Sequence, residues 1–261
     1  MTRPVLEFLV VGDPIDHSLS PRIHQAALDW NGIAGCYRRR RIDAADMAGI
    51  ADDLRAGRLH GVNITMPHKR VAAEVADILT PAAARAGSVN TLAMDNGRLL
   101  GDTTDVAGIR WAWTQVGWGP DDPAYVLGAG GAAAAAILAL EGRELWISAR
   151  RREQAVRLVE ATGVRAHIVA WGSEIAAVVV NATPVGMTPG VHHPSAVLEA
   201  ATGVFDMVYG HRTPAVMYAE TNGLPVCDGR LMLVGQAAES FARWTGVAPP
   251  HAVMLDALTN T

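Results

Sequence analysis

The stretch Ala124–Arg152, AYVLGAGGAAAAAILALEGRELWISARRR, decides the fold of this chain. It opens with the apolar run Ala124–Leu127, which ends at Gly128 and predicts a buried strand. The alanine- and leucine-rich residues that follow favour a helix, which Gly142 ends. Glu144–Ser148 predicts a second strand, so the stretch as a whole predicts a parallel βαβ unit of an α/β protein.

The turn between the first strand and the helix has the pattern of a dinucleotide-binding site. Gly128, Gly130 and Ala133 match G-x-G-x-x-G/A, in which small residues allow a tight turn and a close approach to a pyrophosphate. The first N–H groups of the helix suit a phosphate. Arg150–Arg152 follow the second strand, where an acidic residue would indicate NAD; guanidinium groups suit a 2′-phosphate and predict NADP. The alternative is a structural glycine turn with a solvated basic loop.

Composition narrows the class of protein. With 261 residues, 50% of them hydrophobic, the chain can form two modest domains or one large one, and its net charge of -4 argues against a nucleic-acid surface. Arg38–Arg41 is interpreted as a solvated edge strand. No leader, membrane-spanning run or metal-ligand spacing is found, and Cys36 and Cys227 are far apart, so we expect a cytoplasmic protein. His192 and His193 are expected to be exposed rather than ligating.

The rest of the chain predicts further alternation of strands and helices. Before the decisive stretch, strands are expected at 6–11, 36–42 and 62–65, with a hairpin formed by 89–94 and 98–101. Ser20, Asp43 and Thr80 are expected to cap helices. After the decisive stretch we expect helices at 154–161, 230–244 and 251–258, a helix from Pro214, and strands at 166–169, 176–180, 204–208 and 225–227.

Two charged residues suggest acid–base chemistry. Lys69 and Asp105 each begin a predicted helix just beyond a strand, and open α/β sheets bind ligands beyond the carboxyl ends of their strands. A lysine held by a carboxylate could exchange a proton with a substrate alcohol; the alternative is two surface charges at helix ends. Small polar residues cluster at the same predicted edge and suit a polyhydroxylated acid: Ser18, Ser20, Asn63, Thr65, Asn90, Thr91 and Thr104.

Eight segments in order resemble motifs of the shikimate dehydrogenase family, whose members use NADP to reduce 3-dehydroshikimate to shikimate in aromatic amino-acid biosynthesis. The segments are GDPIDHSLSP (12–21), GVNITMPHK (61–69), AGSVNT (86–91), GDTTD (101–105), GAGGAA (128–133), NATPVGM (181–187), DMVY (206–209) and GRLMLVGQ (229–236). The resemblance covers nearly the whole chain. It implies the same reversible reaction here, with shikimate or 3-dehydroshikimate as the small-molecule substrate.

The resemblance also implies residue roles. Lys69 and Asp105 would be the catalytic acid–base pair. Ser18, Ser20 and Tyr209 would hold the substrate carboxylate, and the ring hydroxyls would be bound by Asn63, Thr65, Asn90, Thr104 and Gln236. The cofactor phosphates would lie on Gly128, Gly130, Gly131 and Ala132, and the 2′-phosphate on Arg150, with added charge from Arg151. The adenosine and nicotinamide ends would be lined by Thr183, Met187, Gly229 and Met232.

The implied architecture is an N-terminal, mostly parallel substrate domain (1–101), a Rossmann-type NADP domain (102–229) and C-terminal helices (230–261) that return to the first domain. Monomer and homodimer both remain open. So do two other functions: a quinate/shikimate or aminoshikimate dehydrogenase of the same family, and a non-catalytic dinucleotide-binding regulatory protein. Two departures from the family pattern are Thr103, where asparagine is usual, and a loop after Tyr209 that is one residue shorter.

Overall fold

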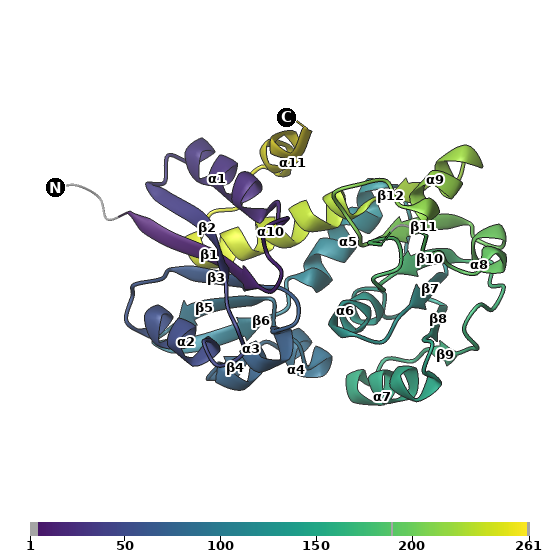
Figure 1. Ribbon diagram of the computed structural model, residues 1–261, viewed down its shortest axis with the longest axis horizontal. Coiled ribbons are helices and arrows are strands. Elements are labelled where there is room, and N and C mark those ends of the chain that lie inside the picture. Colours follow the sequence, from purple (N-terminus) through teal and green to yellow (C-terminus); the bar gives the residue numbers. More distant parts are fainter. Residues whose placement is uncertain (1–4, 189, 260–261) are drawn as a thin grey trace. The chain divides into compact units, whose positions relative to one another are not determined.

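A computed structural model describes residues 5–188 and 190–259. The chain forms two compact units, one from the residues up to Thr104 together with those from Leu233 onward, and the other from Asp105–Met232. Each unit contains one six-stranded sheet (Figure 1). Within the described ranges, no helix is both long enough and apolar enough to cross a membrane.

The sheet of the first unit is mixed, with strand order β2-β1-β3-β5-β6-β4. Its strands are β1 (Leu6–Gly12), β2 (Gly35–Arg41), β3 (Gly61–Ile64), β4 (Ile78–Leu79), β5 (Thr91–Asp95) and β6 (Arg98–Asp102). β1 pairs in parallel with β2 and β3, whereas β5 is antiparallel to β3 and β6. The expected hairpin turn is confirmed: Asn96 and Gly97 have φ values of 48° and 77°, as a type I′ turn requires.

Helices cover both faces of this sheet (Figure 1). They are α1 (Ser20–Trp30), α2 (Met47–Arg55), α3 (Lys69–Val75), α4 (Pro81–Ala86), the part of α10 (Gly229–Thr245) that belongs to this unit, and α11 (His251–Thr259). On one face, residues such as Met47 and Leu54 of α2 join Leu9 and Leu92 in a buried apolar core. On the other face, Tyr37 of β2 stacks on His24 of α1.

Two of the three expected helix caps are wrong. Thr80 does cap α4, because its side chain accepts a hydrogen bond from the Ala83 amide at 3.3 Å. Ser20 is instead the first residue of α1, whose cap position is Leu19. Asp43 accepts hydrogen bonds from the amides of the next residues, at 2.8 Å from Ala45 and 3.2 Å from Asp46, and α2 begins only at residue 47. An aspartate that bonds its own neighbouring backbone forms a turn in place of a helix start.

The second unit has a fully parallel sheet of order β12-β11-β10-β7-β8-β9. Its strands are β7 (Ala124–Leu127), β8 (Leu145–Ser148), β9 (His167–Ile168), β10 (Val178–Asn181), β11 (Gly203–Asp206) and β12 (Val226–Cys227). Its helices are α5 (Asp105–Gln115), α6 (Gly131–Ala139), α7 (Arg152–Thr162), α8 (Ser195–Glu199), α9 (Pro214–Thr221) and the start of α10. The expected Rossmann-type βαβ unit is confirmed, with β7 and β8 paired in parallel around α6.

Candidate active site

The glycine turn after β7 has the geometry that a bound phosphate needs. Gly128 has a φ of +124°, and a Cβ there would lie 2.8 Å from the carbonyl oxygen of Ala182, so only glycine fits. Gly130 occupies the cap position of α6, and no described side chain caps that helix. Apart from residues adjacent to it in the chain and its own helix, no described atom lies within 4 Å of where a Cβ of Gly130 would be. The first amides of α6 are therefore open to an anion at the positive end of the helix dipole.

The end of β8 carries positive charge. The residues that follow Ser148 are Ala149, which is buried, and Arg150 and Arg151, which are exposed. α7 begins at the next residue, and the Arg152 side chain donates to the carbonyl oxygen of Ile168 at 3.1 Å. Residues 149–152, directly after β8, include no aspartate or glutamate to bind a ribose 2′-hydroxyl, so these residues fit NADP better than NAD.

A hydrogen-bonded loop follows β10. The amide of Asn181, which is fully buried, donates to the carbonyl oxygen of Val185 and to Asp206, both at 2.9 Å. Its oxygen accepts from the backbone amide and the hydroxyl of Thr183, at 3.0 and 2.6 Å. Burial raises the pKa of the Asp206 carboxyl, although the hydrogen bonds that it accepts oppose this shift, including one from Thr213 at 2.6 Å. The network therefore fixes the shape of this loop.

The remaining predicted cofactor residues lie after neighbouring strands of the same sheet. Gly229 opens α10 two residues after β12, and a Cβ there would lie 2.7 Å from the carbonyl oxygens of Met207 and Val208. Met187 is exposed, whereas Met232 is buried. Because all six strands are parallel, the segments after β7, β8, β10, β11 and β12 share one edge of the sheet. The structure thus gathers the predicted cofactor residues at one edge.

The predicted substrate residues of the first unit form a buried polar cluster. The Asn90 side chain donates to Thr104 at 3.0 Å and to Gln236 of α10 at 3.1 Å, and accepts from the Thr104 amide at 2.8 Å. Asn63 donates to the carbonyl oxygen of Asn90 at 3.2 Å. Asn63, Asn90 and Thr104 are each at most 5% exposed. Side chains from β3, the hairpin and α10 therefore meet at one place.

Two residues of this cluster were not predicted from the sequence, and a third was predicted without a specific role. Ser240 of α10 is fully buried, and its hydroxyl lies 2.9 Å from Asn63 and Thr91 and 3.1 Å from Thr104. The Tyr37 hydroxyl donates to Asn63 at 2.7 Å. Thr91 was counted among the small polar residues but had no role. Its contacts with its neighbours show that it belongs to the interior of the cluster.

Lys69 and the two serines follow the carboxyl ends of β3 and β1, at the same edge of the first sheet. Lys69 is the first residue of α3, and its carbonyl oxygen accepts from the Val89 amide at 2.9 Å, beside Asn90. Ser18, in the segment between β1 and α1, and Ser20, the first residue of α1, are both buried. That segment is joined to the loop after β3 by a 3.1 Å hydrogen bond between the Asp13 amide and the Met66 carbonyl. Thr65 lies in this second loop.

The other predicted residues belong to the second unit. Asp105 is the first residue of α5 and is 5% exposed; in the chain it directly follows Thr104 of the polar cluster. Tyr209 comes three residues after β11. No three His, Cys, Asp or Glu residues in the described ranges are placed to hold a metal ion.

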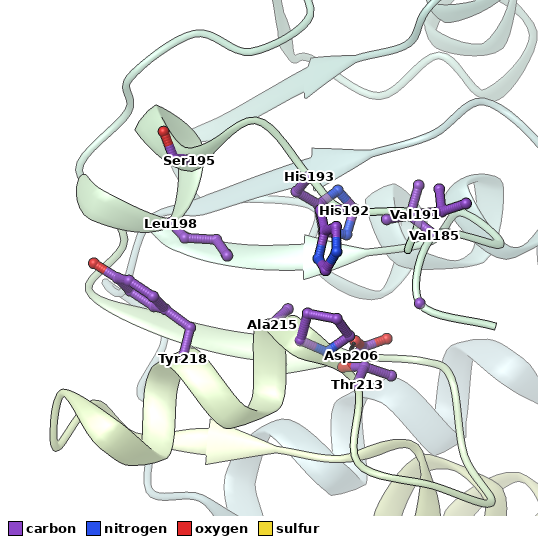
Figure 2. Close-up of a pocket in the computed structure, with 12 residues that line it drawn as sticks. Val185, Val191, His192, His193, Ser195, Leu198, Asp206, Thr213, Ala215 and Tyr218 are labelled. Atoms are coloured by element: carbon purple, nitrogen blue, oxygen red, sulfur yellow. Dashed lines mark hydrogen bonds between the residues drawn. The ribbon is translucent and has the colours of Figure 1, made fainter. Parts of the chain in front are cut away.

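A cavity of about 240 Å³ lies beside the loop after β10 (Figure 2). Val185 and Gly186 line it, as do Asp206 and residues of α8 and α9. His193, which also lines it, is 8% exposed, so the expectation that both histidines are exposed is wrong for His193. Its ring lies beside Trp171, with 6.3 Å between the centroids, and burial lowers its pKa to about 4. The cavity is lined by residues other than the predicted cofactor and substrate residues.

These features define the general class of the protein. A parallel sheet with a glycine turn at its first helix, followed by arginines after the second strand, is typical of NADP-binding domains. The polar cluster of the other unit provides hydroxyl and amide groups for a small polar substrate. Together they define a two-unit oxidoreductase that uses a nicotinamide cofactor.

Comparison with known proteins gives the family. Residues 10–92 match the model of the shikimate dehydrogenase substrate-binding domain, and residues 229–259 match that of the shikimate 5'-dehydrogenase C-terminal domain. The chain is 36% identical to the shikimate dehydrogenase (NADP(+)) of Exiguobacterium sibiricum over 95% of both chains. It is 39% identical to that of Gluconobacter oxydans over 92% of this chain and 90% of the relative.

A solved structure supports the same assignment. The chain resembles shikimate 5-dehydrogenase of Thermus thermophilus, determined in complex with NADP(H) and shikimate, with a TM-score of 0.87. The two are 35% identical, and the match covers 98% of this chain and 99% of the other. The chain belongs to the shikimate dehydrogenase family. The resemblance on which the sequence interpretation rested is confirmed.

Proposed function

We propose that this chain catalyses the reversible NADP-dependent reduction of 3-dehydroshikimate to shikimate. The observation that carries the proposal is the buried cluster in which Asn90 contacts both Thr104 and Gln236, a residue 146 positions away. Such a cluster offers paired donors and acceptors to the hydroxyl groups of a ring once water is excluded. The relatives named shikimate dehydrogenase (NADP(+)) support the choice of substrate and cofactor.

Different residues of the NADP site would bind different parts of the cofactor. The open amides at the start of α6, beyond Gly130, would hold the diphosphate, and Gly128 lets the backbone approach it. Arg150 and Arg151 would pair with the 2′-phosphate. Thr183, Met187, Gly229 and Met232 would line the rest of the cofactor groove. When bound, the nicotinamide supplies or accepts the hydride.

Proton transfer would fall to Lys69. A carbonyl that gains a hydride must also gain a proton on oxygen, and an ammonium group in hydrogen-bond reach can donate it. Asp105 would hold that ammonium in place by the attraction between opposite charges. Ser18, Ser20 and Tyr209 would hold the substrate carboxylate, while Asn63, Thr65, Asn90, Thr104 and Gln236 would fix the ring hydroxyls. Holding the ring in one orientation removes much of the entropic cost of the reaction.

The test is a steady-state assay of the purified full chain with shikimate and NADP, followed by the absorbance of the reduced nicotinamide. We expect turnover by the parent and a fall of about 10²–10⁴-fold in kcat for Lys69→Ala, with a much smaller change in KM. The matched control is Arg70→Ala, because Arg70 is exposed, adjacent and of the same charge. Equal kcat values for Lys69→Ala and Arg70→Ala would contradict the role of Lys69.

The same assay separates the alternative functions. Quinate in place of shikimate tests a quinate/shikimate dehydrogenase, and NAD in place of NADP tests the arginine interpretation. The second comparison matters because a related structure from Listeria monocytogenes, 28% identical, was determined with shikimate and NAD. No turnover with any pair would favour a binding protein without catalysis.

Cellular location and assembly are part of the proposal. We propose a cytoplasmic enzyme, because Cys36 and Cys227 are free thiols, as a reducing compartment allows. We propose a monomer or a homodimer, and light scattering of the purified chain distinguishes the two.

A further inference from the structure

The run of four arginines on the edge strand β2 divides into two pairs. Side chains alternate along a strand, so Arg39 shares a face with Tyr37 and Arg41, whereas Arg38 and Arg40 lie on the opposite face. The opposite-face arginines pair with acidic residues, Arg38 with Glu7 at 3.2 Å and Arg40 with Asp53 of α2 at 3.9 Å. Arg38 and Arg40 therefore fit the role of charged residues that keep an edge strand from pairing with another chain.

The other pair holds the segment that leads from β1 to α1, which carries Ser18 and ends at Ser20, the first residue of α1. Arg41 pairs with Asp13 at the start of this segment, at 2.8 Å. Arg39 donates from Nε and from Nη2 to the carbonyl oxygen of Ser18, at 2.9 and 2.5 Å. Two donors of one guanidinium on one oxygen fix the Ser18 peptide more firmly than a single neutral hydrogen bond. The segment is thus held at both ends by alternate residues of β2.

The side chain of Ser18 is also held within this segment. Ser18 is 3% exposed and Ser20 is 5% exposed. The Ser18 hydroxyl accepts from the Ser20 amide at 3.3 Å, so the two serines form one small unit. In the proposed function these neutral hydroxyls bind the substrate carboxylate. Hydroxyl groups satisfy hydrogen bonds but provide no net charge, and an anion that leaves water needs a nearby positive charge.

We propose that Arg39 is a positioning residue that sets affinity for the substrate carboxylate. It fixes the Ser18 peptide and places a positive charge directly behind the serine that binds the anion. This inference rests on the proposed function and deepens it, because it makes the site selective for an anionic substrate. Screened by solvent, the attraction between two unit charges several ångströms apart corresponds to a factor of about seven in affinity.

The experiment compares Arg39→Gln with Arg38→Gln at saturating NADP. Both variants lose one charge from neighbouring positions of the same exposed strand, but only Arg39 contacts Ser18. We expect KM for shikimate to rise about sevenfold in Arg39→Gln, with kcat within about twofold of the parent, and KM to change less than about twofold in Arg38→Gln. Arg39→Lys, which keeps the charge, should recover most of the affinity.

The dependence of KM on ionic strength distinguishes an electrostatic role of Arg39 from a purely structural one. Raising ionic strength from about 0.05 to 0.5 M shortens the screening length severalfold, so KM for shikimate should rise in the parent and in Arg38→Gln. In Arg39→Gln this dependence should be markedly flatter. A raised KM with an unchanged salt dependence would overturn the inference, and so would equal KM values for the two glutamine variants. Failure of the parent to turn over shikimate would instead overturn the proposed function.

Discussion

His24 should make the first unit sensitive to acid. Its ring is fully buried and stacks nearly parallel on that of Tyr37, with 4.2 Å between the ring centroids; the Trp244 ring is 5.3 Å away. Within the described part of the chain, neither ring nitrogen has a hydrogen-bond partner of good geometry, and the neighbouring Asn63 only partly offsets burial. Burial therefore lowers the pKa of His24 from 6.5 to about 3. The folded chain keeps this ring neutral where the unfolded chain would protonate it.

The sign of the effect follows from linkage. Between pH 6.5 and 3 the unfolded chain binds one more proton at this site than the folded chain does, so the free energy of unfolding falls as pH falls. Stability from this group is fully present above pH 6.5. Each pH unit below that value costs about 1.4 kcal/mol, so moving from pH 7 to pH 5 should cost about 2 kcal/mol.

The assay is urea unfolding at pH 7 and pH 5, followed by tryptophan fluorescence and by circular dichroism, for the parent and for His24→Phe. Phenylalanine keeps the flat ring against Tyr37 and removes the titration. We expect the parent to lose about 2 kcal/mol more than the variant between the two pH values. His167→Gln, which removes an exposed imidazole, serves as the control and should behave as the parent does. Equal pH dependence in the parent and His24→Phe would refute the reasoning.

Two further predictions follow from the other sites. Replacing Arg150 and Arg151 by glutamine should raise KM for NADP by about tenfold or more and leave KM for NAD nearly unchanged, because only NADP carries the 2′-phosphate; equal changes for the two cofactors in the steady-state assay would contradict this. Ser240→Ala should lower the free energy of unfolding by about 0.5–1.5 kcal/mol, because it removes buried hydrogen bonds to Asn63 and Thr91, which keep other partners; urea unfolding at pH 7 with an unchanged midpoint would count against it.

The fold was largely predictable from local pattern. Ala124–Leu127 is a strand over the residues expected. A short apolar run bounded by proline and glycine is typical of a buried strand. The hairpin was predictable because Asn96 and Gly97 tolerate positive φ. The start of α2 was not, since aspartates at 43 and 46 both favour a helix start and the choice depended on backbone bonds that sequence does not show.

The short elements show a second limit. β4, Ile78–Leu79, has only two residues and pairs in parallel with β6, so no periodicity within it can be detected. Similarly, α8 spans only Ser195–Glu199, and its buried residues Val197 and Leu198 contact apolar residues of the sheet and of α9. Tertiary packing forms such elements, and a window of neighbouring residues does not contain that information.

In the candidate site, the sequence indicated which types of residue take part. It did not indicate which of them face a substrate and which support the others. Ser240 lies in the second half of α10, outside all the motifs that the sequence analysis used. Only the return of this helix to the first unit brings its hydroxyl within 3.1 Å of residues more than 130 positions away. The sequence signal that could have identified it is the helical spacing, because Ser240 lies one turn beyond Gln236, whose carbonyl it contacts at 2.9 Å.

Asn63 shows why contact geometry must be added to a motif. Its two amide hydrogens already have three acceptors, the Asn90 carbonyl at 3.2 Å, the Thr91 hydroxyl at 3.0 Å and the Ser240 hydroxyl at 2.9 Å. Its oxygen accepts from Tyr37 at 2.7 Å. A substrate hydroxyl could accept from the Asn63 amide only by displacing one of its three acceptors, and a displaced acceptor would lose a partner in a buried place. Direct binding by Asn63 therefore stays a prediction, whereas its contacts favour a supporting role in which it orients Asn90 and Thr91 beneath the ring.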